Sequence, residues 1–506
     1  MNANLFQHLS DAVADIAKVA IETPDGARHT YEDIILDSGR FANALLAAGV
    51  NPGDRVAVQV EKSVRALTLY LACLRAGAVY LPLNTAYTLN ELGYFIGDAE
   101  PALVVCDPAV RDGLAPIAEP AGAVLHTLDR NGEGSLADLA TEQSHAFPTA
   151  VVEEDDLAAI LYTSGTTGRS KGAMLTHGNL VSNALTLKEA WRFTADDVLI
   201  HALPIYHVHG LFVASNVAFL SDATMIFCPR FDAAEVLRLL PRATVLMGVP
   251  TFYTRLLDRP ELNADAVANM RLFVSGSAPL LADTHRAFAD RTGHAILERY
   301  GMTETGMNTS NPYDGERIAG TVGFPLPDVS IRVTDPETGA ELPEGEIGTV
   351  EVSGPNVFAG YWRMPEKTEA EIRPDGFFIT GDLGRVDERG YLHIVGRGKD
   401  LIISGGFNVY PKEIETELDG LPGVVESAVI GVPHPDFGEG VTAVVVPARD
   451  VAPDEAAILA GLEGRLAKFK LPKRVLFVDD LPRNAMGKVQ KNVLRQENER
   501  LYAKPA

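Results

Sequence analysis

The hydrophobic positions in the first 150 or so residues follow two alternating periods. Apolar residues form short β-rich runs at Val19–Glu22 and Arg55–Val60. After these runs, Tyr31–Ala48 and Val64–Ala76 carry apolar residues at helical spacing, and Gly77 is typical of a helix end. This alternation of strands and helices predicts a layered α/β domain.

The same alternation continues from about residue 155 to about residue 330. Asp283 is expected to cap the helix that follows the central strands. From about 330 to 395 helices become rare, and short strands between proline and glycine turns predict a distorted β-barrel. The expected strands are Leu157–Leu161, Ala173–Leu175, Ala243–Val249, Arg271–Ser275, Ile331–Thr334, Thr349–Ser353 and Tyr391–Val395.

Val198–Ser221 contains no Asp, Glu, Lys or Arg and therefore resembles a membrane span. It also contains Pro204, Asn216 and several histidines, which a helix facing lipid disfavours. We expect a core strand, an active-site loop and a core helix here.

Gly396–Asp400 is the strongest candidate for a domain boundary, because glycines and charges interrupt two apolar strands. A βα-rich segment of about 105 residues follows, which is enough for a small domain. The fold class expected is therefore α/β with several subdomains. Residues 1–396 form a large N-terminal domain of layered α/β subdomains plus the barrel, and residues 401–506 form a small α+β domain.

Charge and cysteine usage narrow the function classes. Acidic residues number 68 against 44 basic ones, and the net charge of −24 argues against nucleic acid and anionic membranes as partners. The 3 cysteines form no CxxC pair, and the N-terminus lacks the features of a signal peptide. We expect a protein of the reducing cytoplasm.

The loop from Tyr162 to Gly172 combines hydroxyls, glycines and cations. Glycines allow backbone N–H groups to approach an anion closely, so this composition suits phosphate binding. It is not a P-loop, because Gly168 is followed by Arg169 and Lys171 by a glycine. A flexible surface loop is the alternative reading of the same composition.

Other short segments carry weaker signals. In Tyr300–Glu304 the carboxylate of Glu304 suits Mg²⁺ held by phosphate oxygens, although an ordinary turn is the alternative. Asp382 suits two ribose hydroxyls, although Thr-Gly-Asp is also a common turn. His207 and His209, at i and i+2 with no further ligand nearby, make a poor zinc site. A lysine such as Lys488 is usually solvated surface.

These segments occur in a fixed order along the chain. The loop is followed by Tyr300–Glu304, Thr380–Asp382, Gly396–Asp400 and Gly487-Lys488. In this order the whole chain resembles the adenylate-forming superfamily of acyl-CoA synthetases, luciferases and peptide-synthetase adenylation domains. Within it, the chain is most similar to the malonyl-CoA synthetases.

The resemblance implies a role for each segment. It implies that Lys488, His207 and Thr163 are catalytic, and that Glu304 and Thr163 bind Mg²⁺. It also implies a hinge at residues 397–400, where a mobile C-terminal domain rotates about Lys399. CoA would lie beside Gly405, Gly406 and Phe407. Nucleotide binding is assigned to Thr163, Ser164, Gly165, Thr166, Thr167, Gly168, Lys171, Ser277, Ala278, Glu298, Tyr300, Gly301, Met302, Thr303, Asp382, Arg397 and Lys488.

The resemblance also implies the substrate. The matching arginine of malonyl-CoA synthetases, Arg286 here, grips the distal carboxylate, although Asp283 could instead keep it on a solvated helix face. His207 and Ser277 would lie beside the acid, and Val208 and Met307 would close the pocket. The family pattern has Thr where this chain has Val208, so preference between malonate and methylmalonate is open.

The implied reaction forms malonyl-AMP from malonate and ATP, and then malonyl-CoA. A synthetase for another small acid, an adenylation domain that loads a carrier protein, a P-loop kinase or ATPase, and a silent nucleotide-binding protein are the alternatives. The missing G-K-[ST] argues against the P-loop enzyme. Exposure of Lys488 in an open state would also make it a target for a protein acetyltransferase.

Overall fold

The computed structural model describes residues 2–163, 170–404, 407–448, 453–463, 465–466, 468–484 and 486–503. The chain forms two compact units. The first comprises Met1–Ile331 and Val352–Phe378, and the second Arg332–Glu351 and Ile379–Ala506. Residues 332–351 and 379–396, which we assigned to the large domain, therefore group with the C-terminal part of the chain. The pivot at Lys399 stays a prediction.

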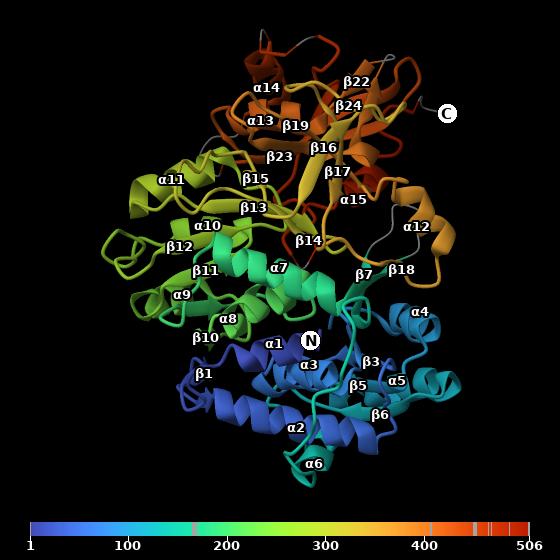
Figure 1. Cartoon of the computed structure of the whole chain (residues 1–506). Coiled ribbons are helices and arrows are strands. Elements are labelled where there is room, and N and C mark those ends of the chain that lie inside the picture. The colour runs from blue at the N-terminus through green and yellow to red at the C-terminus, as the bar shows by residue number, and fades with distance from the viewer. Residues whose placement is uncertain are drawn as a thin grey trace. The chain divides into compact units, whose positions relative to one another are not determined.

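A seven-stranded sheet forms one layer of the first unit (Figure 1). Its inner strands are parallel, and antiparallel pairing begins where β8 joins β7. In sheet order the strands are β18 (Gly360–Tyr361), β8 (Lys171–Thr176), β7 (Leu157–Thr163), β4 (Val79–Pro82), β3 (Arg55–Gln59), β5 (Leu103–Cys106) and β6 (Val124–Thr127).

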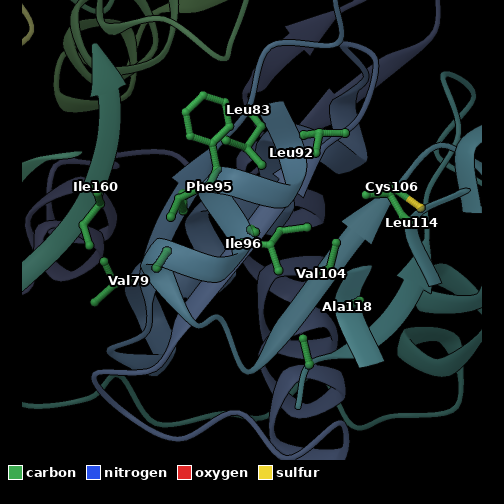
Figure 2. Packing of buried hydrophobic residues seen from close by; sticks show 14 residues of the cluster. Val79, Leu83, Leu92, Phe95, Ile96, Val104, Cys106, Leu114, Ala118 and Ile160 are labelled. Atoms are coloured by element: carbon green, nitrogen blue, oxygen red, sulfur yellow. The ribbon is translucent and has the colours of Figure 1, made fainter. Parts of the chain in front are cut away.

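Helices of the N-terminal region cover this sheet with apolar faces. Figure 2 shows Leu92, Phe95 and Ile96 of α4 packed with Val79 and Val104 of the strands, all nearly inaccessible to water. Burial of such side chains stabilises each by about 1.5–3 kcal/mol. The helices are α1 (Leu5–Asp11), α2 (Tyr31–Ala47), α3 (Val64–Ala76), α4 (Leu89–Ala99), α5 (Arg111–Ala118) and α6 (Ser135–Thr141).

A nine-stranded sheet forms the other layer of the first unit. Its strands are β15 (Phe324–Pro325), β14 (Gly306–Ser310), β13 (Leu297–Met302), β12 (Leu272–Ser275), β11 (Val245–Gly248), β9 (Val198–His201), β10 (Thr224–Phe227), β1 (Val19–Glu22) and β2 (Arg28–Thr30). The helices that follow in the chain are α7 (His177–Ala190), α8 (Asn216–Leu220), α9 (Ala233–Leu239), α10 (Pro250–Leu257), α11 (Ala282–Thr292) and α12 (Pro365–Glu371).

The second unit contains a five-stranded sheet and most of a four-stranded one. The four-stranded sheet occupies the predicted barrel region, with β16 (Ser330–Thr334), β17 (Gly348–Ser353), β19 (Phe378–Val386) and β20 (Leu392–Arg397). The five-stranded sheet has β22 (Phe407–Val409), β21 (Ile402–Ser404), β24 (Gly438–Pro447), β23 (Val424–His434) and β25 (Arg474–Phe477). Its helices are α13 (Pro411–Asp419), α14 (Glu455–Leu462) and α15 (Lys491–Glu497).

The uncharged stretch Val198–Ser221 divides as expected into strand β9, a loop and a buried helical part, whose segment His209–Ser215 is a π-helix. Among the helices that the structure describes, none combines the length and the apolar character needed to cross a bilayer. The expected cap at Asp283 is wrong, because α11 begins at Ala282 with Leu281 at the N-cap position. Asp283 lies in the first turn, where its charge favours the helix dipole.

Candidate active site

The ends of the predicted phosphate loop are held by an antiparallel strand pair. Thr163 ends β7 and lies opposite Lys171, which begins β8. The predicted Ser164, Gly165, Thr166, Thr167 and Gly168 lie outside the described residues. The register nevertheless places the two ends of the loop side by side, so residues at both ends could contact the same anion.

Lys171 is nearly buried and is held by groups of the first unit. Its Nζ lies 3.3 and 3.4 Å from the two carboxylate oxygens of Glu371. The ammonium also lies 4.0 Å from the centre of the Tyr361 ring. A cation with these partners is fixed at the end of the loop.

Glu304, the predicted metal ligand, lies between β13 and β14 and is buried. Its Oε1 accepts from the Tyr361 hydroxyl at 3.1 Å and from Thr163 Oγ1 at 3.4 Å. Thr163 and Glu304, paired by the resemblance alone, are thus brought together. The described residues contain no group of three or more His, Cys, Asp or Glu side chains that could hold a metal by themselves.

Strands β13 and β14 also carry Tyr300, Gly301, Met302 and Met307. Gly301 lies opposite Met307, and a Cβ at Gly301 would come within 2.0 Å of the Gly306 carbonyl oxygen. Any larger residue would separate the strands. Met307 is buried, and its backbone N and O are both bonded to the Asn183 side chain, at 3.0 and 2.9 Å.

Three of the predicted acid-binding residues, His207, Val208 and Ser277, lie outside the strands of the first unit. Val208 is buried, and His207 is half-buried just before it. Ser277 follows β12 in the left-handed region, with φ of +70°, and its hydroxyl lies 3.2 Å from Nδ1 of His209. Burial and then the charge of Arg299 lower the pKa of His207 to about 4. His207 is therefore a neutral imidazole near pH 7.

Arg299, on β13, is a residue that the sequence analysis missed. It is 3% exposed, and neither its Nε nor its Nη2 has a hydrogen-bond partner among the described residues. A Cβ at Gly276 would lie 2.3 Å from the guanidinium carbon, so this glycine makes room for the cation. Burial lowers the pKa of Arg299 to about 9. A buried cation whose N–H groups lack partners could hold an anion through charge-assisted hydrogen bonds.

Arg286 lies on α11 of the first unit. Its side chain is 62% exposed and forms an ion pair with Asp283, itself 71% exposed, one helical turn away. This is the solvated-face arrangement that the sequence left open. The role of Arg286 with malonate stays a prediction, because its side chain is exposed and paired with Asp283.

In the second unit, Asp382 and Arg397 face each other across β19 and β20. Arg397 Nε lies 2.7 Å from Oδ1 of the buried Asp382. Lys399 lies in the short 3₁₀ turn Gly398–Asp400 that follows.

Lys488 is exposed, and the charges of Arg397, Asp382, Lys399 and Asp400 of the second unit act on its ammonium. Desolvation, followed by the charge of Arg397, lowers the pKa of Lys488 to about 8, whereas the charge of Asp382 raises it. The structure thus groups Lys488 with the two residues predicted to hold the ribose.

Of the residues predicted to contact CoA, Gly405 and Gly406 lie outside the described residues. Phe407 is 54% exposed and stacks on Phe469, with ring centroids 4.7 Å apart. An exposed aromatic ring of this kind offers an apolar surface to a ligand arm.

The chain matches the AMP-binding enzyme family over residues 10–362 and the AMP-binding enzyme C-terminal domain over residues 413–488. It is 68% identical to MatB from Rhodopseudomonas palustris, whose structure was solved with ATP bound, at a TM-score of 0.98 over 99% of this chain and 100% of that one. A feruloyl-CoA synthase of Amycolatopsis sp is 39% identical over 93% of this chain and 94% of its own length. A malonate–CoA ligase of Arabidopsis thaliana is 35% identical over 97% and 88%. The chain therefore belongs to the AMP-binding enzyme family.

Proposed function

We propose that the chain is an ATP-dependent malonate–CoA ligase. A malonate carboxylate oxygen attacks the α-phosphorus of ATP, the bond to the β-phosphate breaks, and malonyl-AMP and pyrophosphate result. The CoA sulfur then attacks the acyl carbon, AMP leaves with the bonding electrons, and the thiol proton passes to solvent. The malonate–CoA ligase relative and the full-length likeness to MatB support this assignment.

The observation that carries the diacid substrate is the buried Arg299. A malonate bound with one carboxylate toward the nucleotide has a second one to place. Arg299 lies beside Gly276 and its charge acts on His207, and among the described residues its Nε and Nη2 have no hydrogen-bond partner. Pairing with an anion would repay the cost of burying this cation. Arg286 is the alternative partner, and it would have to leave Asp283 and solvent.

Neutral His207 suits the reacting end of the acid. An uncharged imidazole donates one hydrogen bond to the carboxylate and does not neutralise the nucleophile. Val208 and Met307 are both buried, and both side chains limit the size of the acid in this assignment. We therefore expect the highest kcat/KM with malonate, a lower one with 2-methylmalonate, and a much lower one with acetate, because acetate has no second carboxylate to pair with Arg299.

Glu304 and Thr163 would hold Mg²⁺. Their oxygens lie 3.4 Å apart, and oxygens of this kind are the hard ligands that Mg²⁺ prefers. When bound, Mg²⁺ would offset phosphate charge. The chain's own contribution is to hold the Glu304 carboxylate through Tyr361 and Thr163.

The second unit would supply the mobile groups. Asp382 would accept hydrogen bonds from the ribose, Arg397 would support it, and Lys488 would stabilise charge at the α-phosphate during adenylation. Rotation about Lys399 would then bring Phe407, Gly405 and Gly406 to the CoA arm. We also propose a cytoplasmic location, which suits three buried free thiols, and acetylation of Lys488 as a way to remove its charge.

A second candidate is an aromatic-acid ligase, because the feruloyl-CoA synthase is 39% identical and the malonate–CoA ligase 35%. Pyrophosphate release should be measured with malonate, methylmalonate, succinate, acetate, butyrate and ferulate, each with and without CoA. Malonate should give the highest kcat/KM. A preference for ferulate or butyrate would replace our assignment with this second one.

A further inference from the structure

The segment around Lys488 is a tight hairpin in the second unit. Arg483 and Val489 form an antiparallel bridge, and Asn484 N donates to the Lys488 carbonyl at 2.9 Å. The Asn484 side-chain oxygen accepts from the backbone N–H groups of Met486 and Lys488, both at 3.0 Å. The backbone of Lys488 is therefore held from both sides by its own hairpin.

Arg483 connects this hairpin to the sheet. Its Nη1 donates to the carbonyl oxygen of Gly487 at 2.9 Å, and its Nη2 forms an ion pair with Glu426 of β23. One planar guanidinium thus joins the residue next to Lys488 to a strand of the five-stranded sheet, a geometry that lysine cannot reproduce.

The anchor is partly sheltered from water. The Arg483 and Glu426 side chains are 23% and 25% exposed. Burial raises the pKa of Glu426, and the charge of Arg483 opposes this effect. Because the pair is partly desolvated, it constrains the hairpin more than a surface ion pair would. Leu481 and Met486 are also buried, so apolar contacts hold the hairpin as well.

We propose that Arg483, held by Glu426, is a positioning residue for Lys488 in the adenylation half-reaction. The inference rests on the proposed role of Lys488. A lysine side chain is long and flexible, so the direction of its ammonium depends on how firmly its backbone is fixed. Arg483 reaches the Gly487 carbonyl directly and needs no contact with substrate.

The test compares Arg483→Met with Arg474→Met. Arg474 forms an ion pair with Glu455 in the same unit at 3.1 Å, and among the described residues no hydrogen bond joins its side chain to the hairpin, so it controls for loss of an Arg–Glu pair. We expect Arg483→Met to slow pyrophosphate release about 10- to 100-fold, the cost of misplacing a catalytic group by about 1 Å. Thioester formation from supplied malonyl-AMP should change less than about twofold, and Arg474→Met should leave both steps unchanged.

The double variant Arg483→Met with Lys488→Ala separates positioning from general destabilisation. If Arg483 acts through Lys488, the double variant adenylates as slowly as Lys488→Ala alone. Glu426→Gln, a milder change, should slow the same half-reaction by a smaller factor. Additive losses, or equal losses in both half-reactions, would overturn the inference.

Failure of the proposed function has a different signature. If Lys488→Ala adenylates at the wild-type rate, the role of Lys488 is wrong and the inference falls with it. If Lys488→Ala is impaired and Arg483→Met adenylates normally, the inference alone is overturned.

Discussion

Replacement of Arg299 by methionine should remove malonate activity and spare the fold. The guanidinium is buried, and its Nε and Nη2 have no hydrogen-bond partner in the part of the chain that the structure describes, so replacement breaks no described hydrogen bond at these two atoms. The charge of the neighbouring Glu298 partly offsets the buried charge of Arg299. Replacement by an apolar side chain of similar length should therefore change the midpoint of thermal unfolding little.

The magnitude follows from the two unused donors. A hydrogen bond to a charged group contributes about 1.5–3 kcal/mol, so two bonds to the distal carboxylate give about 3–6 kcal/mol. At about 1.4 kcal/mol per tenfold, kcat/KM for malonate should fall by about 10²- to 10⁴-fold. Activity with butyrate should fall much less, because butyrate has no second carboxylate to leave unpaired.

The assay is pyrophosphate release with malonate and with butyrate, for wild type, Arg299→Met and Arg286→Ala. Arg286→Ala tests the sequence-based prediction, under which it removes most diacid activity. If Arg299 is the partner, Arg286→Ala should retain malonate preference. If Arg299→Met still prefers malonate and Arg286→Ala loses this preference, the assignment of the distal carboxylate to the buried Arg299 is wrong.

Other predictions address the remaining residues. Lys488→Ala should suppress adenylation by several orders of magnitude and largely spare thioester formation from malonyl-AMP; equal losses in both steps, measured separately, would contradict this. Lys399→Pro should impair thioester formation more than adenylation, because proline fixes φ where rotation is required, and wild-type rates in both would exclude the hinge. Since the pKa of Lys488 is about 8, its charge is present below that pH, and single-turnover adenylation should slow as pH rises through 8. Lys488→Arg should move this decline upward. Val208→Thr should alter the ratio of kcat/KM for malonate and methylmalonate and keep diacid use; an unchanged ratio would exclude Val208 from the pocket.

Local sequence signals were sufficient to predict the bounds of helices whose terminal residues form the caps. Helix α3 runs over the predicted Val64–Ala76, because the Ser63 side chain accepts from a first-turn N–H and Gly77 adopts a left-handed conformation with φ of +70°. Asp283 was a poor guide, since a carboxylate also favours the first turn without capping. The pairing of Thr163 with Glu304 required the family resemblance, because 140 or so residues separate them.

The cation that we propose to bind the acid could not be identified from local sequence. Arg286 and Arg299 are both arginines near apolar residues, and their difference lies in tertiary packing. Arg286 has an acidic neighbour one helical turn away, whereas Arg299 lies on a buried strand beside Gly276. Glu298-Arg299 directly after the apolar run Ala295–Leu297 was the available signal, because charges at buried strand positions need a reason.

Mass spectrometry of the two half-reactions with malonate distinguishes a malonate–CoA ligase from a ligase for another acid. Wild-type protein incubated with ATP, Mg²⁺ and malonate should accumulate malonyl-AMP, and addition of CoA should convert it to malonyl-CoA with release of AMP. Formation of feruloyl-AMP or butyryl-AMP in preference to malonyl-AMP, from an equimolar mixture of the acids, would contradict the account.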